Sequence, residues 1–385
     1  MDATFSLGRV AGVRVGVHWS VLVVFALIAV GLAQGRLPRA HPGSPAWAYW
    51  LTALATAVVF LLALLAHEIS HVMVARRNGV GADEITLWLL GGAARLHDEA
   101  PTPRAELRIA GIGPLVSLLL GGLFALLTWW THALHSPGLL VEALAWLAGI
   151  NILLALFNVL PAAPLDGGRL LRALVWWRTG NRLRATEVAT GAGRALGWIL
   201  VAVGVYEALA GGFAGGLWLL LIGWFMVAMA TMEGSQAKLR ELLRSVPVRQ
   251  AMSADPVTAA AGTTVREFLD GPPWRYRHSA FPVTDPAGRP VGLVSVRQAG
   301  QVPVEDRDST SLDAVMVPLG DIPTAGPDDP LAQLVPALEA SPARRALVLV
   351  DGRVVGIVTS SDVSRVIAWL SSTTPPGAGL RTARQ

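Results

Sequence analysis

Cysteine is absent from the 385 residues, and charged residues are scarce. Without cysteine there can be no disulfide and no thiolate ligand, so any metal site must use His, Asp or Glu. Charged residues make up 15% of the chain, against about 25% in soluble domains, while hydrophobic residues reach 53%. The formal net charge is only +4, and no basic face indicates a nucleic-acid partner.

Long apolar runs are confined to the first 232 residues. A membrane-spanning helix needs about 20 mostly apolar residues. Six segments qualify: 16–34, 47–74, 109–131, 139–160, 193–209 and 216–232. The remainder has the composition of a soluble chain. The sequence therefore predicts a polytopic α-helical membrane protein with six transmembrane helices, followed by a soluble α/β module.

Lys and Arg lie mostly on one side of these predicted spans. They cluster before the first span and after the second, fourth and sixth, whereas the opposite loops carry only Arg36 and Arg39. Because such residues concentrate in cytoplasmic loops, we expect both termini in the cytoplasm.

An apolar segment at 84–96, between the second and third spans, is too short to cross the membrane. Gly91 and Gly92 lie in its middle. A β-hairpin or re-entrant segment is one interpretation, tolerable at membrane depth if it is buried or lines a cavity. A short surface helix fits the pattern equally well.

The second predicted span contains His67-Glu68-Ile69-Ser70-His71. The i, i+4 spacing puts both imidazoles on one helix face, which suits two ligands of a tetrahedral zinc ion. Glu68 lies beside the first imidazole, where its carboxylate can take a proton from a zinc-activated water. A charged group in an apolar span costs about 2.5 kcal/mol or more, which favours a functional site over a His pair that only packs helices.

A catalytic zinc usually has a third protein ligand, and Asp166 is the carboxylate expected to supply it. It follows the fourth span, in a segment that Pro161 and Pro164 interrupt. A broken helix can line a polar cavity. The alternative is that Asp166 only caps the next helix. His71 and Asp166 lie near the cytoplasmic ends of their spans, on one side and at one depth, as a single site requires.

These two motifs, with the second read as N-x-x-P-x-x-P-L-D-G-G from Asn158, resemble those of the site-2 protease family of intramembrane metalloproteases. The resemblance covers about residues 5–232. It implies that His67, His71 and Asp166 bind one catalytic Zn²⁺ and that Glu68 is the catalytic glutamate.

The same resemblance implies that Asn158 binds substrate, where its amide can donate to the developing oxyanion. A hydrogen bond between packed helices is an equally good explanation of Asn158 from its residue type alone. Leu90-Gly91-Gly92 resembles the family's membrane-embedded hairpin, which would align substrate by strand addition. Ser117 stands where the family often has Asn, and no role is predicted for it.

The soluble part contains an internal repeat, in which residues 248–252 match 312–316. Each copy has two β-rich runs around an Asp/Gly turn, at 285–288 and 351–352. Two such units facing each other would bury one shared core. The repeat resembles a tandem pair of CBS domains, in which Thr359 and Asp362 would contact the ribose of an adenine nucleotide. The first copy has Gln298 instead of the Asp, and a purely structural pair without an adenosyl ligand is the alternative.

We place the transmembrane metalloprotease domain at 1–235, a linker at 236–247, CBS domains at 248–302 and 311–370, and a disordered tail at 371–385. The predicted function is a zinc endopeptidase that cleaves transmembrane segments of membrane-anchored proteins and is regulated by the CBS pair. Its setting would be the lipids of a bacterial or archaeal plasma membrane, with a second copy of the chain as a candidate partner. A CBS-gated metal transporter or sensor would use the same ligands, but Glu68 beside two His is what hydrolysis requires.

Overall fold

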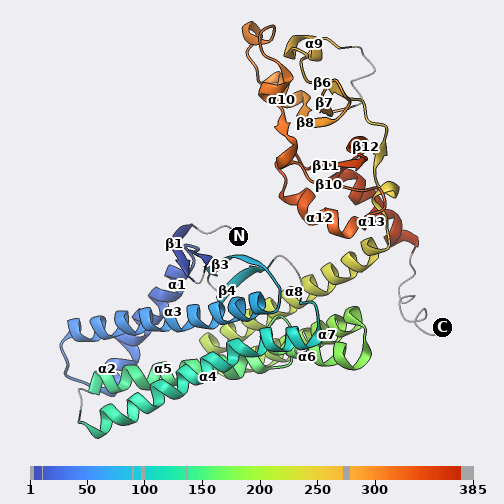
Figure 1. Ribbon diagram of the computed structural model, residues 1–385. Coiled ribbons are helices and arrows are strands. Elements are labelled where there is room, and N and C mark those ends of the chain that lie inside the picture. The colour runs from blue at the N-terminus through green and yellow to red at the C-terminus, as the bar shows by residue number, and fades with distance from the viewer. Residues whose placement is uncertain are drawn as a thin grey trace. The chain divides into compact units, whose positions relative to one another are not determined.

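The chain divides into two compact units, Met1–Ser235 and Gln236–Gln385 (Figure 1). This computed structural model describes residues 4–10, 12–88, 91–96, 100–135, 138–271 and 278–373. The predicted disordered tail therefore lies outside the described residues from position 374 onward.

Among the described residues, six helical segments are long and apolar enough to cross a membrane, which confirms the predicted number. Their bounds are Val21–Ala40, Ala46–Arg77 (α3), Pro103–Ala133 (α4), Gly138–Val159 (α5), Arg182–Leu209 (α7) and Phe213–Arg244 (α8). A shorter helix, α6 (Asp166–Thr179), lies between α5 and α7 in the sequence. Helix α4 packs against α3, α5 and α6 and is therefore central to the first unit.

The first span begins at Val21, so the predicted start at Gly16 was wrong. Gly16 belongs to strand β2 (Val13–Val17), because a short run of buried valines can form a strand as readily as a helix. The span itself consists of α1 (Val21–Val30), a π-helical stretch (Gly31–Arg36) and α2 (Leu37–Ala40).

A four-stranded sheet packs against α3, in the order β1 (Phe5–Val10), β2, β3 (Ala82–Trp88) and β4 (Gly91–Leu96). Strands β3 and β4 pair antiparallel, so the hairpin interpretation is confirmed and the surface helix was wrong. Leu90 of the predicted motif lies outside the described residues. Ile85 and Val13 form a small core with Val72 of α3, which attaches the sheet to the helix that carries the HEISH motif.

A non-helical connection separates α5, which ends at Val159, from α6, which begins at Asp166. The backbone of this connection lies very close to two glycines. A Cβ at Gly168 would lie 2.4 Å from the amide nitrogen of Ala163, and one at Gly193 of α7 would lie 2.0 Å from the Ala163 carbonyl oxygen. Neither position has room for a larger side chain, so α6 and α7 together define the path of the connection.

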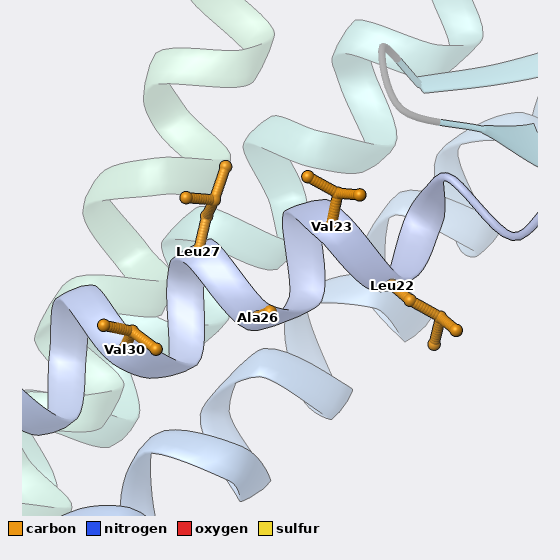
Figure 2. Close-up of a pocket in the computed structure, with 5 residues that line it drawn as sticks. All are labelled: Leu22, Val23, Ala26, Leu27 and Val30. Atoms are coloured by element: carbon orange, nitrogen blue, oxygen red, sulfur yellow. The ribbon is translucent and has the colours of Figure 1, made fainter.

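Large apolar side chains cover much of the outer surface of the membrane unit. Figure 2 shows an apolar stretch of α1 that includes Leu22, Val23, Leu27 and Val30, with the smaller Ala26 among them. Leu22 and Leu27 are 59% and 62% exposed. A contiguous apolar surface of this kind is unfavourable in water and suits contact with lipid chains.

The second unit contains two four-stranded sheets in which the repeats exchange short strands. One sheet has the order β6 (Ala259–Ala260), β7 (Ala280–Thr284), β8 (Pro290–Ser295) and β9 (Val317–Pro318). The other has β10 (Thr324–Ala325), β11 (Arg345–Val350), β12 (Arg353–Thr359) and β5 (Ser253–Ala254). Thus β5, from the start of the first repeat, pairs with the second sheet, and β9, from the start of the second, pairs with the first.

The module has two main hydrophobic cores instead of the single core that was expected, but both are shared: Val248 of the first repeat lies in one and Leu312 of the second repeat lies in the other. Short helices cover each sheet separately: α9 (Val265–Leu269), α10 (Val296–Gly300), α11 (Leu312–Val315), α12 (Leu331–Ala340) and α13 (Ser360–Thr373). The repeats meet in a smaller cluster of Leu293, Ile322 and Leu347. The predicted turn at Asp351-Gly352 is present, with positive φ at both residues, as a two-residue type I′ hairpin requires.

Helix α8 continues without a break from the first unit into the second, through residues 236–244 of the expected linker. Its last turns contribute Leu239 and Leu243 to the core of the second repeat. Leu243 is only 2% exposed. The end of the last transmembrane helix is therefore also a part of the CBS module.

We predict that Leu243→Ala destabilises the second unit by about 2–5 kcal/mol, the usual cost of removing a buried leucine side chain. Limited proteolysis of the full chain in detergent should then cleave the second unit faster, while the first unit keeps its resistance. Leu221→Ala, at a 52% exposed position of the same helix, is the matched control and should behave like the unmodified chain. Equal protection in both variants would contradict a role for α8 in the CBS core.

Candidate metal centre

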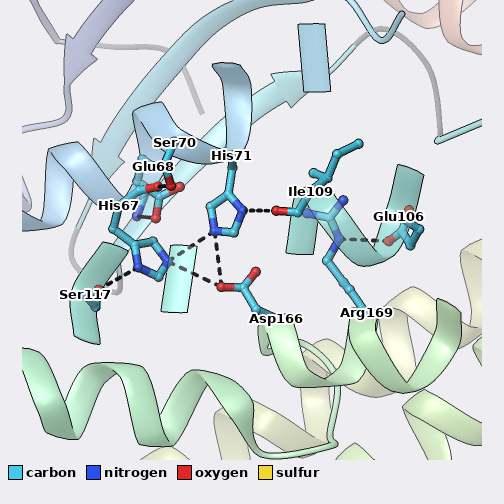
Figure 3. Close-up of polar contacts among 10 residues, drawn as sticks. His67, Glu68, Ser70, His71, Glu106, Ile109, Ser117, Asp166 and Arg169 are labelled. Carbon is cyan, nitrogen blue, oxygen red and sulfur yellow. Dashed lines mark hydrogen bonds and ion pairs between the residues drawn. The ribbon is translucent and has the colours of Figure 1, made fainter. Parts of the chain in front are cut away.

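His67 and His71 of α3 and Asp166 of α6 converge on one point inside the helical bundle (Figure 3). The two Nε2 atoms lie 3.2 Å apart. Oδ2 of Asp166 lies 3.3 Å from Nε2 of His67 and 3.2 Å from Nε2 of His71. Both histidines are buried, at 3% and 7% exposure. Asp166 begins α6 and the N-cap position is Leu165, so its carboxylate does not cap that helix.

The three atoms form a nearly equilateral triangle, and this shape indicates what can occupy the site. One proton bridges only two of the three atoms, whereas a cation between them satisfies all three. Zinc–ligand bonds of about 2.0–2.1 Å at tetrahedral angles place ligand atoms about 3.3 Å apart. The observed separations match that spacing, so this donor set fits zinc.

The outer nitrogens of both imidazoles have partners on α4. Nδ1 of His71 lies 2.6 Å from the carbonyl oxygen of Ile109. A carbonyl only accepts, so Nδ1 must carry a proton, which in a neutral imidazole leaves the Nε2 lone pair free to bind metal. Nδ1 of His67 lies 2.8 Å from Oγ of Ser117, which is fully buried.

Ser117 was thus missed as a site residue in the sequence. Its position in the G-P-x-x-N-like element of α4 was the available signal, but nothing in one sequence placed that element beside His67. Ile109 gave no signal at all, because it acts through its backbone carbonyl.

Gly113 is where α4 passes closest to the imidazoles. A Cβ there would lie 2.2 Å from Nε2 of His71 and 2.7 Å from Nε2 of His67. Any side chain would displace the rings, so the close approach of α4 requires glycine at this position.

Glu68 is oriented by the hairpin. The backbone N–H of Gly92 on β4 donates to Oε1 of Glu68 at 3.2 Å. A Cβ at Gly92 would lie 2.2 Å from Cγ of Glu68, so the strand can approach this side chain only because it has none of its own. The carboxylate and the three candidate ligands therefore lie in one region, where α3, α4, α6 and the hairpin meet.

The other predicted site residues are placed less directly. Asn158 is half-buried near the end of α5, and its side chain has no hydrogen-bond partner within the described part of the chain. In the second unit, Oδ2 of Asp362 accepts from both the backbone N–H and the hydroxyl of Thr359, at 2.9 and 2.7 Å. Ser295 and Gln298 form the equivalent capping box at α10. The roles of Asn158, Thr359 and Asp362 in binding stay predictions.

A family model described as "Peptidase family M50" matches residues 55–134 and 132–200, which include the HEISH motif and Asp166. A second model, "CBS domain", matches 248–299 and 312–368. Rip3 of Mycobacterium tuberculosis H37Rv, which is named as a zinc metalloprotease, is 45% identical to this chain. The match covers 95% of this chain and 93% of Rip3. The chain belongs to peptidase family M50, the site-2 proteases. It is therefore a multi-pass membrane zinc metalloendopeptidase with a C-terminal pair of CBS domains.

Other M50-like proteins are more distant. The Synechocystis protein sll0528, also named as a zinc metalloprotease, is 29% identical to this chain. The match covers 95% of this chain and 96% of the Synechocystis protein. The solved site-2 protease of Methanocaldococcus jannaschii is 25% identical, with a TM-score of 0.42, and covers 60% of this M50 chain and 94% of its own.

We predict that Gly113→Ala lowers the zinc affinity of this M50 protease by about tenfold or more, a typical effect of disturbing groups next to metal ligands. Chelator competition on the purified protein measures it. Gly122→Ala on the same helix is the matched control, since a Cβ there meets nothing within 4 Å. Zinc binding that is unchanged in Gly113→Ala would contradict the position of the site against α4.

Proposed function

We propose that this M50 protease cleaves transmembrane segments of membrane-anchored proteins, with His67, His71 and Asp166 as zinc ligands and Glu68 as proton carrier. The observation that carries the proposal is the triangle of Nε2, Nε2 and Oδ2 atoms at 3.2–3.3 Å. These polar groups come from apolar helices, where an unpaired ionisable group is costly. A substrate that reaches them lies at membrane depth.

Zinc at this site would supply a Lewis acid that polarises the peptide carbonyl and lowers the pKa of water to about 7. The residues of the chain handle the protons. Glu68 takes a proton from the attacking water and returns it to the leaving nitrogen. The Gly92 N–H, which donates to Oε1 of Glu68, keeps the carboxylate oriented through both transfers. The bond broken is the substrate's C–N amide bond, and a carboxylate and an amine leave.

Strand β4 is the natural docking edge for the substrate backbone. It is the last strand in the order β1-β2-β3-β4, so one side of its backbone has no strand partner within the described sheet. A substrate helix must unwind before hydrolysis, because helical hydrogen bonds shield its carbonyls. An extended segment added to β4 would exchange those bonds for ladder bonds and would lie beside Gly92 and Glu68.

Asn158 is proposed to donate its amide to the oxyanion. A Cβ at Gly121 of α4 would contact Ala148 and Ile152 of α5, and the short connection between these helices makes them antiparallel. From that contact, eight residues of α4, about 12 Å, lead back to Gly113, and six to ten residues of α5, about 9–15 Å, lead forward to Asn158. This count supports placing Asn158 at about the depth of Gly113.

Glu68→Gln should lower cleavage by about 10²–10⁴-fold, the usual contribution of a general base, and leave zinc content unchanged. Candidate single-span membrane proteins, co-expressed with either form, provide the readout. Retained proteolysis in the variant would refute the proposed mechanism, and zinc loss would assign Glu68 to the metal rather than to proton transfer.

The CBS pair is proposed to regulate the protease from the cytoplasm, where the excess of Arg and Lys in the adjoining loops would place it. Helix α8 offers the physical connection. Leu239 and Leu243 belong to the CBS core, and two turns earlier Glu233 lies 3.5 Å from Arg172 of α6, the helix that begins at Asp166. A shift of α8 caused by a CBS ligand would therefore act on α6.

An adenine nucleotide is the proposed ligand of the second repeat, through Thr359 and Asp362. AMP or ATP should raise the thermal midpoint of the purified full chain but not that of Asp362→Asn, since ligand binding stabilises only the form that binds it. Asp351→Asn, in the hairpin turn of the same repeat, is the matched control and should keep the shift. If neither nucleotide shifts the unmodified chain, the CBS pair has another ligand or none.

A further inference from the structure

One face of α4 contacts both candidate histidine ligands and the helix that carries Asp166. Glu106, Ile109, Gly113 and Ser117 follow one another at intervals of three and four residues, so they lie on one side of the helix. All four are buried. Ser117 hydrogen-bonds His67, Ile109 hydrogen-bonds His71, and a Cβ at Gly113 would clash with both rings. Glu106 has no contact with either imidazole among the described bonds and is unexplained by the protease mechanism.

Glu106 is a carboxylate with 1% exposure between two guanidinium groups of α6. Its Oε1 accepts from Nε of Arg169 at 3.0 Å and from Nη2 of Arg172 at 2.5 Å. Figure 3 shows the Glu106–Arg169 contact beside the metal ligands. Arg172 also lies 3.5 Å from Glu233 of α8. These contacts join two carboxylates and two guanidinium groups from α4, α6 and α8.

We propose that Glu106, through Arg169 and Arg172, is the positioning residue for Asp166, doing for the third ligand what Ser117 and Ile109 do for the two histidines. The inference rests on the proposed ligand role of Asp166. Asp166 is the first residue of α6, and Arg169 and Arg172 lie three and six residues later. An aspartate side chain is short, so the place of its carboxylate depends on the place of this first turn.

If this cluster only stabilised the packing of α4 against α6, charged side chains would offer no advantage over apolar ones. Buried ion pairs are often no more stabilising than apolar residues of similar size. Directional bonds to the two Arg side chains instead define both the depth and the rotation of α6 against α4. Metal ligands require placement to within a fraction of an ångström, and a two-point attachment close to the ligand supplies it.

The decisive variant is Glu106→Gln/Arg169→Gln, which removes one charge of each sign and leaves Arg172 paired with Glu233. Glu106→Gln alone would leave excess positive charge buried and is therefore less informative. The double variant should bind zinc about 10–100-fold more weakly, as is usual when a group that supports a metal ligand is removed, while its thermal midpoint in zinc-free buffer stays unchanged. Chelator competition on the full chain gives the affinity.

A thermodynamic cycle with Asp166→Asn then separates positioning from general stabilisation. If the cluster acts through Asp166, adding the Glu106→Gln/Arg169→Gln changes to Asp166→Asn should lower the zinc affinity no further. The reason is that the effects of coupled residues are not additive. If the double change lowers the zinc affinity equally in the presence and in the absence of Asp166, the proposal is overturned. Should the double variant fail to fold, Arg169→Gln alone, which keeps the Glu106–Arg172 pair, enters the same cycle.

Glu142→Gln is the matched control, because it breaks the Arg36–Glu142 ion pair of the same unit and should leave zinc affinity unchanged. The readout needs no substrate, so the outcome is independent of whether the proposed cleavage occurs. If the losses of zinc affinity are additive while the chain still cleaves substrate, only the role of Glu106 is refuted. If the losses are coupled but no proteolysis occurs, only the proposed function is refuted.

Discussion

The arrangement of the candidate site depends on three electron-pair donors, two imidazole nitrogens and one carboxylate oxygen, that face one another inside an apolar helical bundle. Nε2 of His67, Nε2 of His71 and Oδ2 of Asp166 lie 3.2–3.3 Å apart, and a single proton could satisfy only two of the three. Such an arrangement is costly among helices built for lipid. On the proposed assignment, a divalent ion held by these three atoms would offset that cost and connect α3 to α6.

Helix α4 is the template on which this site is built. Its glycine at 113 admits the imidazoles, its Ser117 and Ile109 orient them, and its Glu106 attaches α6. The hairpin approaches from another side and brings Gly92 to Glu68. Helix α8 links the same region to the CBS module, because it carries Glu233 beside Arg172 and ends in the core of the second repeat. The proposed regulation would therefore act through helices that also hold the candidate metal site.

The sequence predicted the parts of this design that local pattern encodes. Helix spacing placed His67 and His71 on one face with Glu68 beside them, and charge asymmetry put Asp166 at the same depth. Gly91-Gly92 was compatible with the hairpin, but the pattern fitted a surface helix equally well. The sequence did not predict β1 and β2, because a valine run suits a strand or a helix and the partner β3 lies far along the chain. Ser117, Ile109 and Glu106 escaped for a similar reason: their roles come from tertiary contacts, one of them through a backbone carbonyl. The exchange of β5 and β9 between repeats also depends on contacts that no repeat shows by itself.

X-ray absorption at the zinc edge, on the zinc-loaded full chain in lipid nanodiscs, tests the central claim most directly. The account predicts a four-coordinate ion with two imidazole nitrogens and carboxylate oxygen at about 2.0–2.2 Å. Multiple scattering from the imidazole rings identifies the histidines. A shell of six oxygens, or one without imidazole scattering, would show that His67, His71 and Asp166 do not bind the metal together and would contradict the account.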